Sequence, residues 1–165
     1  MIIKFDYKKI LLAGILSIIG VSLYAFPAEL FFAKGNSSIY TSTPAVWKFL
    51  NPSTGEFIWS FWDYVPILLA KFIALSIFAL IFELLYSSIP GKGIWKGFYF
   101  AIIVYLITIP ARIDLFFFIR MSNAVNLWWA ISHFIELSIV GIILGYVYRK
   151  GKGHIFLHKN HKNRQ

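Results

Sequence analysis

The segment VPILLAKFIALSIFALIFELLY, residues Val65–Tyr86, decides the fold of this 165-residue chain. It carries two ionisable side chains among apolar ones, and about 20 apolar residues in a helix cross the roughly 30 Å hydrocarbon core of a bilayer. Three further segments of this kind are Ile10–Ala33, Ile94–Pro110 and Leu127–Tyr148. The sequence therefore predicts an all-α integral membrane protein folded as a four-transmembrane-helix bundle.

The composition supports the same class. Hydrophobic residues make up 59% of the chain and charged residues 14%, which leaves more apolar surface than a soluble domain of this size buries. Residues 1–150 are predicted to form one four-span domain, and residues 151–165 a basic cytoplasmic tail. The absence of cysteine excludes disulfides and thiolate metal sites. The net charge of +9 lies at the span ends, so nucleic acid is not an expected partner.

The distribution of basic residues predicts the orientation of the spans. Eleven lysines and arginines precede the first span, separate the second from the third, or follow the fourth, against four in the other two connections. Basic loops stay in the cytoplasm, so both termini are predicted to be cytoplasmic in a multi-pass protein of a prokaryotic plasma (inner) membrane. A signal peptide competes for the first segment, because a basic start, the run Ile10–Leu23 and Ala25 fit that pattern. We expect the segment to remain as a span.

The connections differ in length and character. The outer connection Lys34–Tyr64 is long and aromatic, and we expect one or two short interfacial helices there, at the depth where aromatic rings anchor proteins. The connection Ser87–Lys96 contains Pro90, Gly91 and Gly93. This composition predicts a tight turn that makes the second and third spans antiparallel neighbours.

Pro110 leaves two alternatives for the third span. The helix either ends there, with residues 111–122 along the membrane interface, or it kinks and continues as far as Ile119. We favour the continuing helix because Arg112 and Asp114 then face protein rather than lipid.

Six ionisable residues gather in the outer half of the predicted bundle. A charge inside a span is costly and usually faces a partner or a cavity, so these residues are the candidate functional cluster. Glu29 and Lys71 lie at similar predicted depth and are candidates for an ion pair, and His133 and Glu136 share one helical face. Glu83 lies nearer the cytoplasm, where Lys96 or the basic N-terminus would neutralise it. The cluster consists of Glu29, Lys71, Arg112, Asp114, His133 and Glu136.

Gly141 and Gly145 place two small residues on one face of the fourth span, in the GxxxG spacing that allows close helix packing. Ala13, Ser17 and Gly20 form a similar stripe in the first span. The sequence leaves open whether the glycines contact the first span or another subunit.

The chain lacks common catalytic motifs and a convincing metal site. It has no G-x-S-x-G, H-E-x-x-H or P-loop sequence, so we do not expect an enzyme, and we expect no cofactor. In the tail, His154, His158 and His161 would share a helical face and are a weak alternative for metal binding. A solvated tail attracted to anionic lipid is the simpler interpretation.

These observations predict a small, non-catalytic accessory or scaffold subunit of a larger membrane complex. Its expected partners are the lipid bilayer and either other membrane subunits or further copies of itself. The alternative is a small transporter or channel that moves protons or ions through the outer-half cluster, since histidine and carboxylate side chains form proton relays in membranes. In the first case the same cluster is a polar network that fixes helix register.

Overall fold

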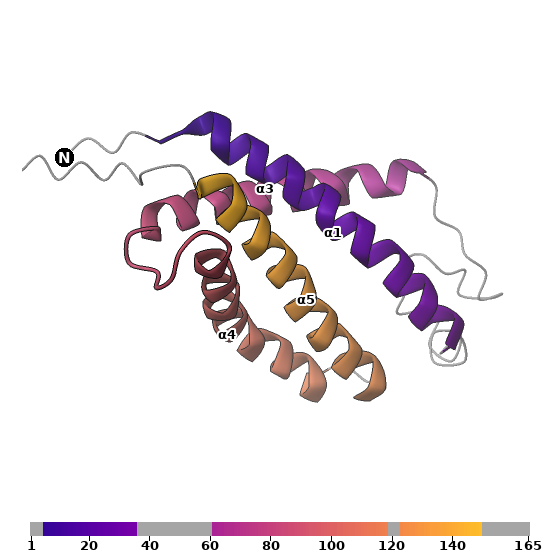
Figure 1. Ribbon diagram of the computed structural model, residues 1–165. Coiled ribbons are helices and arrows are strands. Elements are labelled where there is room, and N and C mark those ends of the chain that lie inside the picture. Colours follow the sequence, from indigo (N-terminus) through magenta and orange to yellow (C-terminus); the bar gives the residue numbers. More distant parts are fainter. Residues whose placement is uncertain (1–4, 36–60, 119–122, 150–165) are drawn as a thin grey trace, which may run out of the picture.

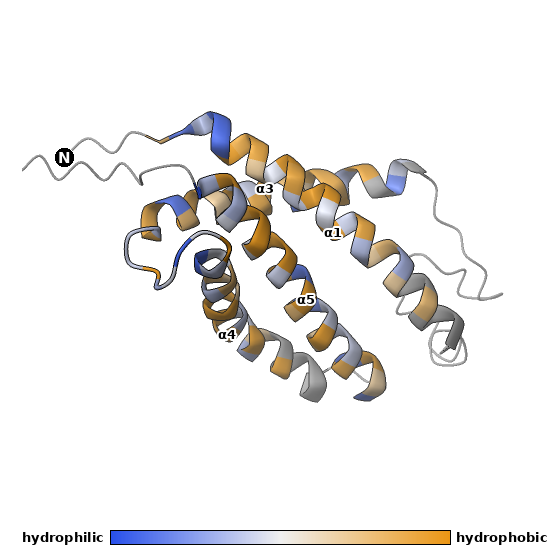
Figure 2. Ribbon diagram, in the orientation of Figure 1, coloured by the Kyte–Doolittle hydropathy of each residue, from blue (hydrophilic) through white to orange (hydrophobic). Residues whose placement is uncertain are grey.

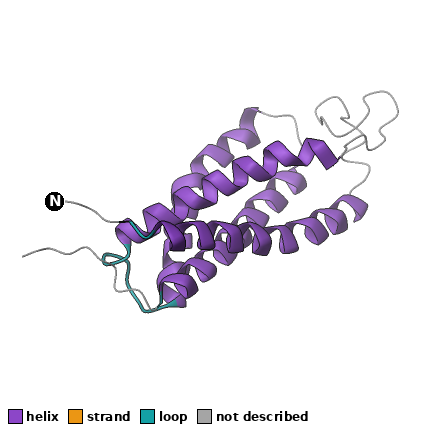
Figure 3. Cartoon of the chain, turned by 90° about the horizontal axis from the view of Figure 1, so that it is seen from above, coloured by secondary structure: helices purple, strands orange, loops and turns teal. Residues whose placement is uncertain are grey.

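The computed structural model describes residues 5–35, 61–118 and 123–149, and these residues are helical apart from the turns and ends (Figure 3). Helix α1 covers Tyr7–Gly35, α3 covers Phe61–Leu85, α4 covers Ile94–Phe118 and α5 covers Asn123–Tyr148. All four contain a segment long and apolar enough to cross a membrane. The length and composition of these helices are consistent with the predicted class, a multi-pass helical membrane protein. Residues 36–60, which make up most of the predicted outer connection Lys34–Tyr64, and residues 150–165, which include the predicted tail, lie outside the described residues.

The helix boundaries follow local chemistry. Asp6 caps α1, because its carboxylate accepts a hydrogen bond from the Lys9 backbone N–H at 3.2 Å. Pro110 lies inside α4, which continues to Phe118, so the structure adopts the continuing-helix alternative for the third span.

Gly91 and Gly93 have positive φ angles of 87° and 52° in the turn between α3 and α4. That backbone conformation favours glycine and lets the chain reverse in few residues.

The helices form an open row in the order α4, α5, α1, α3 (Figure 1). Helix α5 packs closely against α4 on one side and against α1 on the other, and α3 packs mainly against α1. Phe82 and Phe100 are in edge contact, with ring centroids 5.2 Å apart, near the turn that joins α3 to α4. Away from the turn, α3 and α4 pack little against each other. The short turn therefore keeps α3 and α4 in contact at one end of the two helices only.

Hydrophilic residues gather around the start of α1 and around the α3–α4 turn, whereas apolar residues cover most of the helix length (Figure 2). The starts of α1 and α4 meet the ends of α3 and α5 there, as the contacts of Asp6 with Glu83 and of Gly93 with Arg149 show. We call this the turn end of the molecule. The buried core lies between the helices and includes Phe82, Val140 and Leu144.

Candidate functional site

The closest helix contact involves the glycines of α5. A Cβ atom added to Gly145 would lie 2.6 Å from the backbone oxygen of Gly93, and one added to Gly97 would lie 2.8 Å from the backbone nitrogen of Gly145. Gly141 likewise faces the backbone of Gly97 and would meet the Ala101 Cβ at 2.9 Å. The partner of the GxxxG pair is therefore α4 of the same chain, which was neither of the two alternatives that the sequence left open.

The spacing of small residues in α4 explains this contact. Gly93, Gly97 and Ala101 recur every four residues and form a stripe that matches Gly141 and Gly145. This signal was present in the sequence but was not recognised, because Gly93 and Gly97 flank the start of the third span. The small stripe of α1 faces α5 instead, since a Cβ on Gly20 would meet the Ile143 and Ile139 side chains at 2.9 and 3.1 Å.

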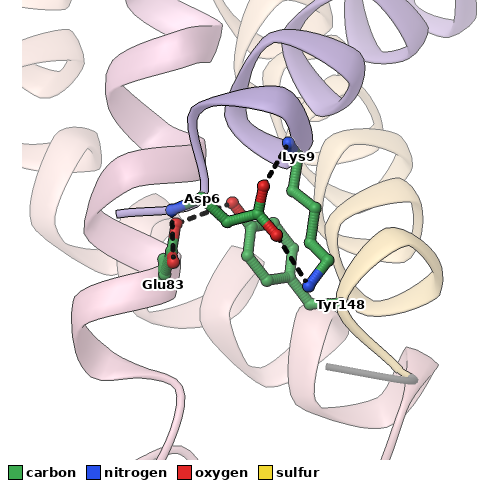
Figure 4. A network of polar contacts seen from close by, with 4 residues as sticks. All are labelled: Asp6, Lys9, Glu83 and Tyr148. Carbon is green, nitrogen blue, oxygen red and sulfur yellow. Dashed lines mark hydrogen bonds and ion pairs between the residues drawn. The ribbon is translucent and has the colours of Figure 1, made fainter. Parts of the chain in front are cut away.

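A polar network ties three helices together at the turn end (Figure 4). The Glu83 carboxylate of α3 accepts hydrogen bonds from the Asp6 backbone N–H at 3.1 Å and from the Tyr148 hydroxyl of α5 at 3.2 Å. The Lys9 ammonium forms an ion pair with Asp6 at 3.0 Å. Because Tyr148 is only 4% exposed, its hydroxyl needs this partner. The network links α1, α3 and α5 where the row of helices is otherwise held by apolar contacts.

Lys96 does not serve as the partner of Glu83. Its ammonium donates hydrogen bonds to the backbone oxygens of Tyr86 and Ile89, the latter at 2.6 Å, and lies over the Tyr86 ring. These carbonyls follow the end of α3, where intrahelical partners are lacking. The sequence offered Lys96 and the N-terminus as alternatives, and the contact to Glu83 comes from the N-terminal segment through Asp6.

Only half of the predicted outer-half cluster has described side chains. The side chains of Glu29, Arg112 and Asp114 lie outside the described residues, although their backbones belong to α1 and α4. Lys71 is partly buried on α3, and His133 and Glu136 are partly buried on α5. That all six residues form one cluster stays a prediction.

His133 contacts α4. One of its ring nitrogens, Nε2, lies 3.1 Å from the Thr108 hydroxyl, and its ring centroid lies 6.0 Å from that of Tyr105. The Thr108 hydroxyl also donates toward the Val104 carbonyl, 3.0 Å away and one turn earlier in its own helix. His133 is thus a polar link between α4 and α5, one turn from Glu136.

The register of α1 against α3 locates Lys71 relative to Glu29. A Cβ on Gly14 would lie 2.6 Å from the Ser76 hydroxyl, and the helices are antiparallel, since Asp6 contacts Glu83. Lys71 lies five residues before Ser76, so it is level with the position five residues after Gly14. Glu29 lies about ten residues further along α1, which is roughly 15 Å at 1.5 Å per residue. The two residues are therefore separated along the helix axis, and the ion pair between Glu29 and Lys71 stays a prediction.

Metal ligands do not gather in the part of the chain that the structure describes: no group of three or more histidine, aspartate or glutamate side chains could hold an ion there. The predicted tail residues His154, His158 and His161 lie outside that part. Comparison with known proteins finds no matching family model, no matching curated protein and no matching solved structure.

Proposed function

We propose that this protein is a non-catalytic subunit of a larger membrane complex and that it contacts its partner through α3. The observation that carries the proposal is the position of Lys71. This residue is a lysine inside a span, on the helix that is least buried against the rest of the described chain.

Helix α3 is the least covered of the four spans. Within its most apolar window, 17% of residues are buried inside the protein, compared with 33% in α5. One stripe of α3 faces away from the rest of the chain at helical spacing and includes Ala70, Ile73, Ile77 and Ile81. Buried residues Leu75, Ala79 and Phe82 occupy the opposite face. The exposed stripe supports helix–helix contact with another protein, because the small Ala70 side chain permits close approach.

The environment of Lys71 supports the same proposal. Among the described residues, no carboxylate lies within ion-pair distance of its ammonium group. Insertion of a lysine near the centre of a span costs about 2.5–3.5 kcal/mol, and such residues are usually paired. Glu29 lies roughly 15 Å away along α1 by the helix register. A carboxylate on a partner helix beside α3 would offset this cost and select the partner.

Site-specific photo-crosslinking tests the proposal in native membranes. A benzophenone side chain at Ile77 should give a discrete crosslinked protein, and the Lys71→Leu substitution should reduce that product at least fivefold. The matched control places the same group at Ile107 of α4, which is 72% exposed, and should give no discrete protein product. A product of twice the 19.0 kDa chain mass would indicate a homo-oligomer and contradict the subunit proposal. Equal products from both positions would also contradict it.

The alternative function is proton or ion translocation, and one observation favours it. His133 bridges α4 and α5 through Thr108, and Glu136 lies one turn away on the same helix. Histidine and glutamate side chains at this spacing are parts of a proton relay. Liposomes containing the purified protein discriminate the two functions. A proton flux that is lost in Glu136→Gln but retained in Lys71→Leu would support translocation and contradict the subunit proposal.

A further inference from the structure

Most basic residues of the chain belong to the turn end or adjoin it in sequence. They number eleven, against two acidic residues, Asp6 and Glu83, whereas five basic and five acidic residues lie elsewhere in the sequence. Among the described residues, the basic ones at the turn end are Lys8, Lys9, Lys92, Lys96 and Arg149. This excess of positive charge favours the binding of an anion at the turn end.

Both acidic residues at the turn end already have partners. Asp6 pairs with Lys9 and caps α1, while Glu83 accepts hydrogen bonds from Asp6 and Tyr148. Lys96 is held by the carbonyls of Tyr86 and Ile89. The exposed Lys92 and Arg149 side chains, in contrast, form no ion pair with a described carboxylate. Their charges are available to a ligand.

The turn between α3 and α4 carries Lys92 and lies beside Arg149. Lys92 lies between Gly91, whose added Cβ would contact Trp95 and Tyr99, and Gly93, whose added Cβ would lie 3.8 Å from the Arg149 Cβ. The Arg149 guanidinium carbon lies 4.1 Å from the centroid of the Tyr146 ring, which orients the side chain. Trp95 is 65% exposed. We call Lys92, Trp95, Tyr146 and Arg149 the turn-end patch.

We propose that the turn-end patch binds the phosphate group of an anionic phospholipid. A guanidinium presents paired N–H donors that match phosphate oxygens, and the lysine adds a second positive charge. Trp and Tyr rings with a polar edge favour the headgroup depth of a bilayer, which is where a lipid phosphate lies. The exposed apolar residue Ile142 lies one helical turn from Tyr146 on α5. It would contact an acyl chain of the same lipid, so the patch fits a membrane lipid better than a soluble phosphate.

The site is distinct from the proposed contact through α3. It is formed by the turn, the first turns of α4 and the end of α5, and none of its residues belongs to the exposed stripe of α3. A negative result for the contact through α3 would therefore not contradict lipid binding at the turn-end patch.

Native mass spectrometry of the full chain tests the lipid site. The protein is released from micelles containing equal amounts of phosphatidylglycerol and phosphatidylcholine with identical acyl chains. The wild type should retain phosphatidylglycerol preferentially. The double variant Lys92→Gln/Arg149→Gln should retain about tenfold less of it, since each basic residue near a membrane surface contributes to anionic-lipid binding. Retention of phosphatidylcholine should be unchanged, and unfolding in detergent should confirm that the variant is folded.

The matched control is Lys4→Gln/Lys8→Gln, which removes the same charge from the sequence around the start of α1. It should retain phosphatidylglycerol as the wild type does. Equal losses in the two double variants would show that net charge alone attracts the lipid and would overturn the proposal. Equal retention of both lipids by the wild type would overturn it as well. Displacement of the lipid by millimolar inorganic phosphate would assign the site to a soluble anion instead.

Discussion

Substitution of Gly97 by alanine should destabilise the protein through the α4–α5 contact. The new methyl group would lie 2.6 Å from the Gly141 carbonyl carbon, whereas ordinary contacts of a Cβ atom begin near 3.4 Å. The obstacle is backbone on both sides, the Gly141 carbonyl group above all, so no rotamer change relieves it and the helix axes must separate. A radial gap of about 0.5–1 Å already forfeits a quarter to a half of the dispersion energy of the contacting atoms.

Two opposing effects determine the expected change in the free energy of unfolding. Overpacking a well-packed core typically costs about 1–3 kcal/mol, while alanine gains about 1 kcal/mol over glycine in helix propensity. Because the contact is to backbone, we expect the upper part of that range and a net loss of about 1–2 kcal/mol in the free energy of unfolding. Unfolding by a denaturing detergent, followed through tryptophan fluorescence, measures this loss.

Gly20→Ala is the matched control. Its new methyl group would meet Cδ1 of Ile143 at 2.9 Å, which χ2 rotation can move, and Cγ2 of Ile139 at 3.1 Å, a contact that a small shift of the side chain relieves. We expect a change within about 0.5 kcal/mol of zero, because the propensity gain offsets the adjustment. If Gly97→Ala proves as stable as the wild type, or no less stable than Gly20→Ala, the inference that α4 and α5 meet backbone to backbone is wrong.

Three further predictions concern buried or paired polar groups. Tyr148→Phe should lower stability by about 0.5–1.5 kcal/mol through the lost hydrogen bond to Glu83, and in a Glu83→Gln background the loss should shrink, which a double-mutant cycle measures. The Lys9 side chain holds the pKa of Asp6 below its usual 3.8, so this pair stabilises the folded protein above that pH and the stabilisation fades as pH falls through the lower folded value. Asp6→Asn should therefore lower stability at neutral pH and flatten its decline below pH 3.8, and an unchanged acid profile would contradict the pairing. Ser17 is fully buried and its hydroxyl has no hydrogen-bond partner among the described residues, so Ser17→Ala should leave the free energy of unfolding unchanged or raise it by up to about 1 kcal/mol. A clear loss would show that the hydroxyl is satisfied.

The interior positions of the polar groups limited what the sequence could predict about the candidate site. His133 and Glu136 were recognised because an ionisable residue stands out in an apolar span. Thr108, the partner of His133, does not stand out, since a threonine can satisfy its hydroxyl within its own helix. The link between Glu83 and Tyr148 joins residues 65 positions apart in sequence, and no periodic pattern relates them. Contacts between helices depend on how each helix is rotated about its own axis and on how deep it lies in the membrane, and composition specifies neither.

The sequence by itself determined that the chain consists of apolar helices and where they lie along it, because the length of a membrane span and its hydropathy are local properties. It also marked the positions where small side chains permit close packing. Only the tertiary structure decided which helices are neighbours. The GxxxG face of α5 pairs with Gly93, Gly97 and Ala101 of α4, and α3 joins the row through α1 rather than through α4, its neighbour across the short turn. The physical reason is that helix pairing in an apolar environment depends on shape complementarity between surfaces of similar hydropathy, and that shape exists only once the helices are placed side by side.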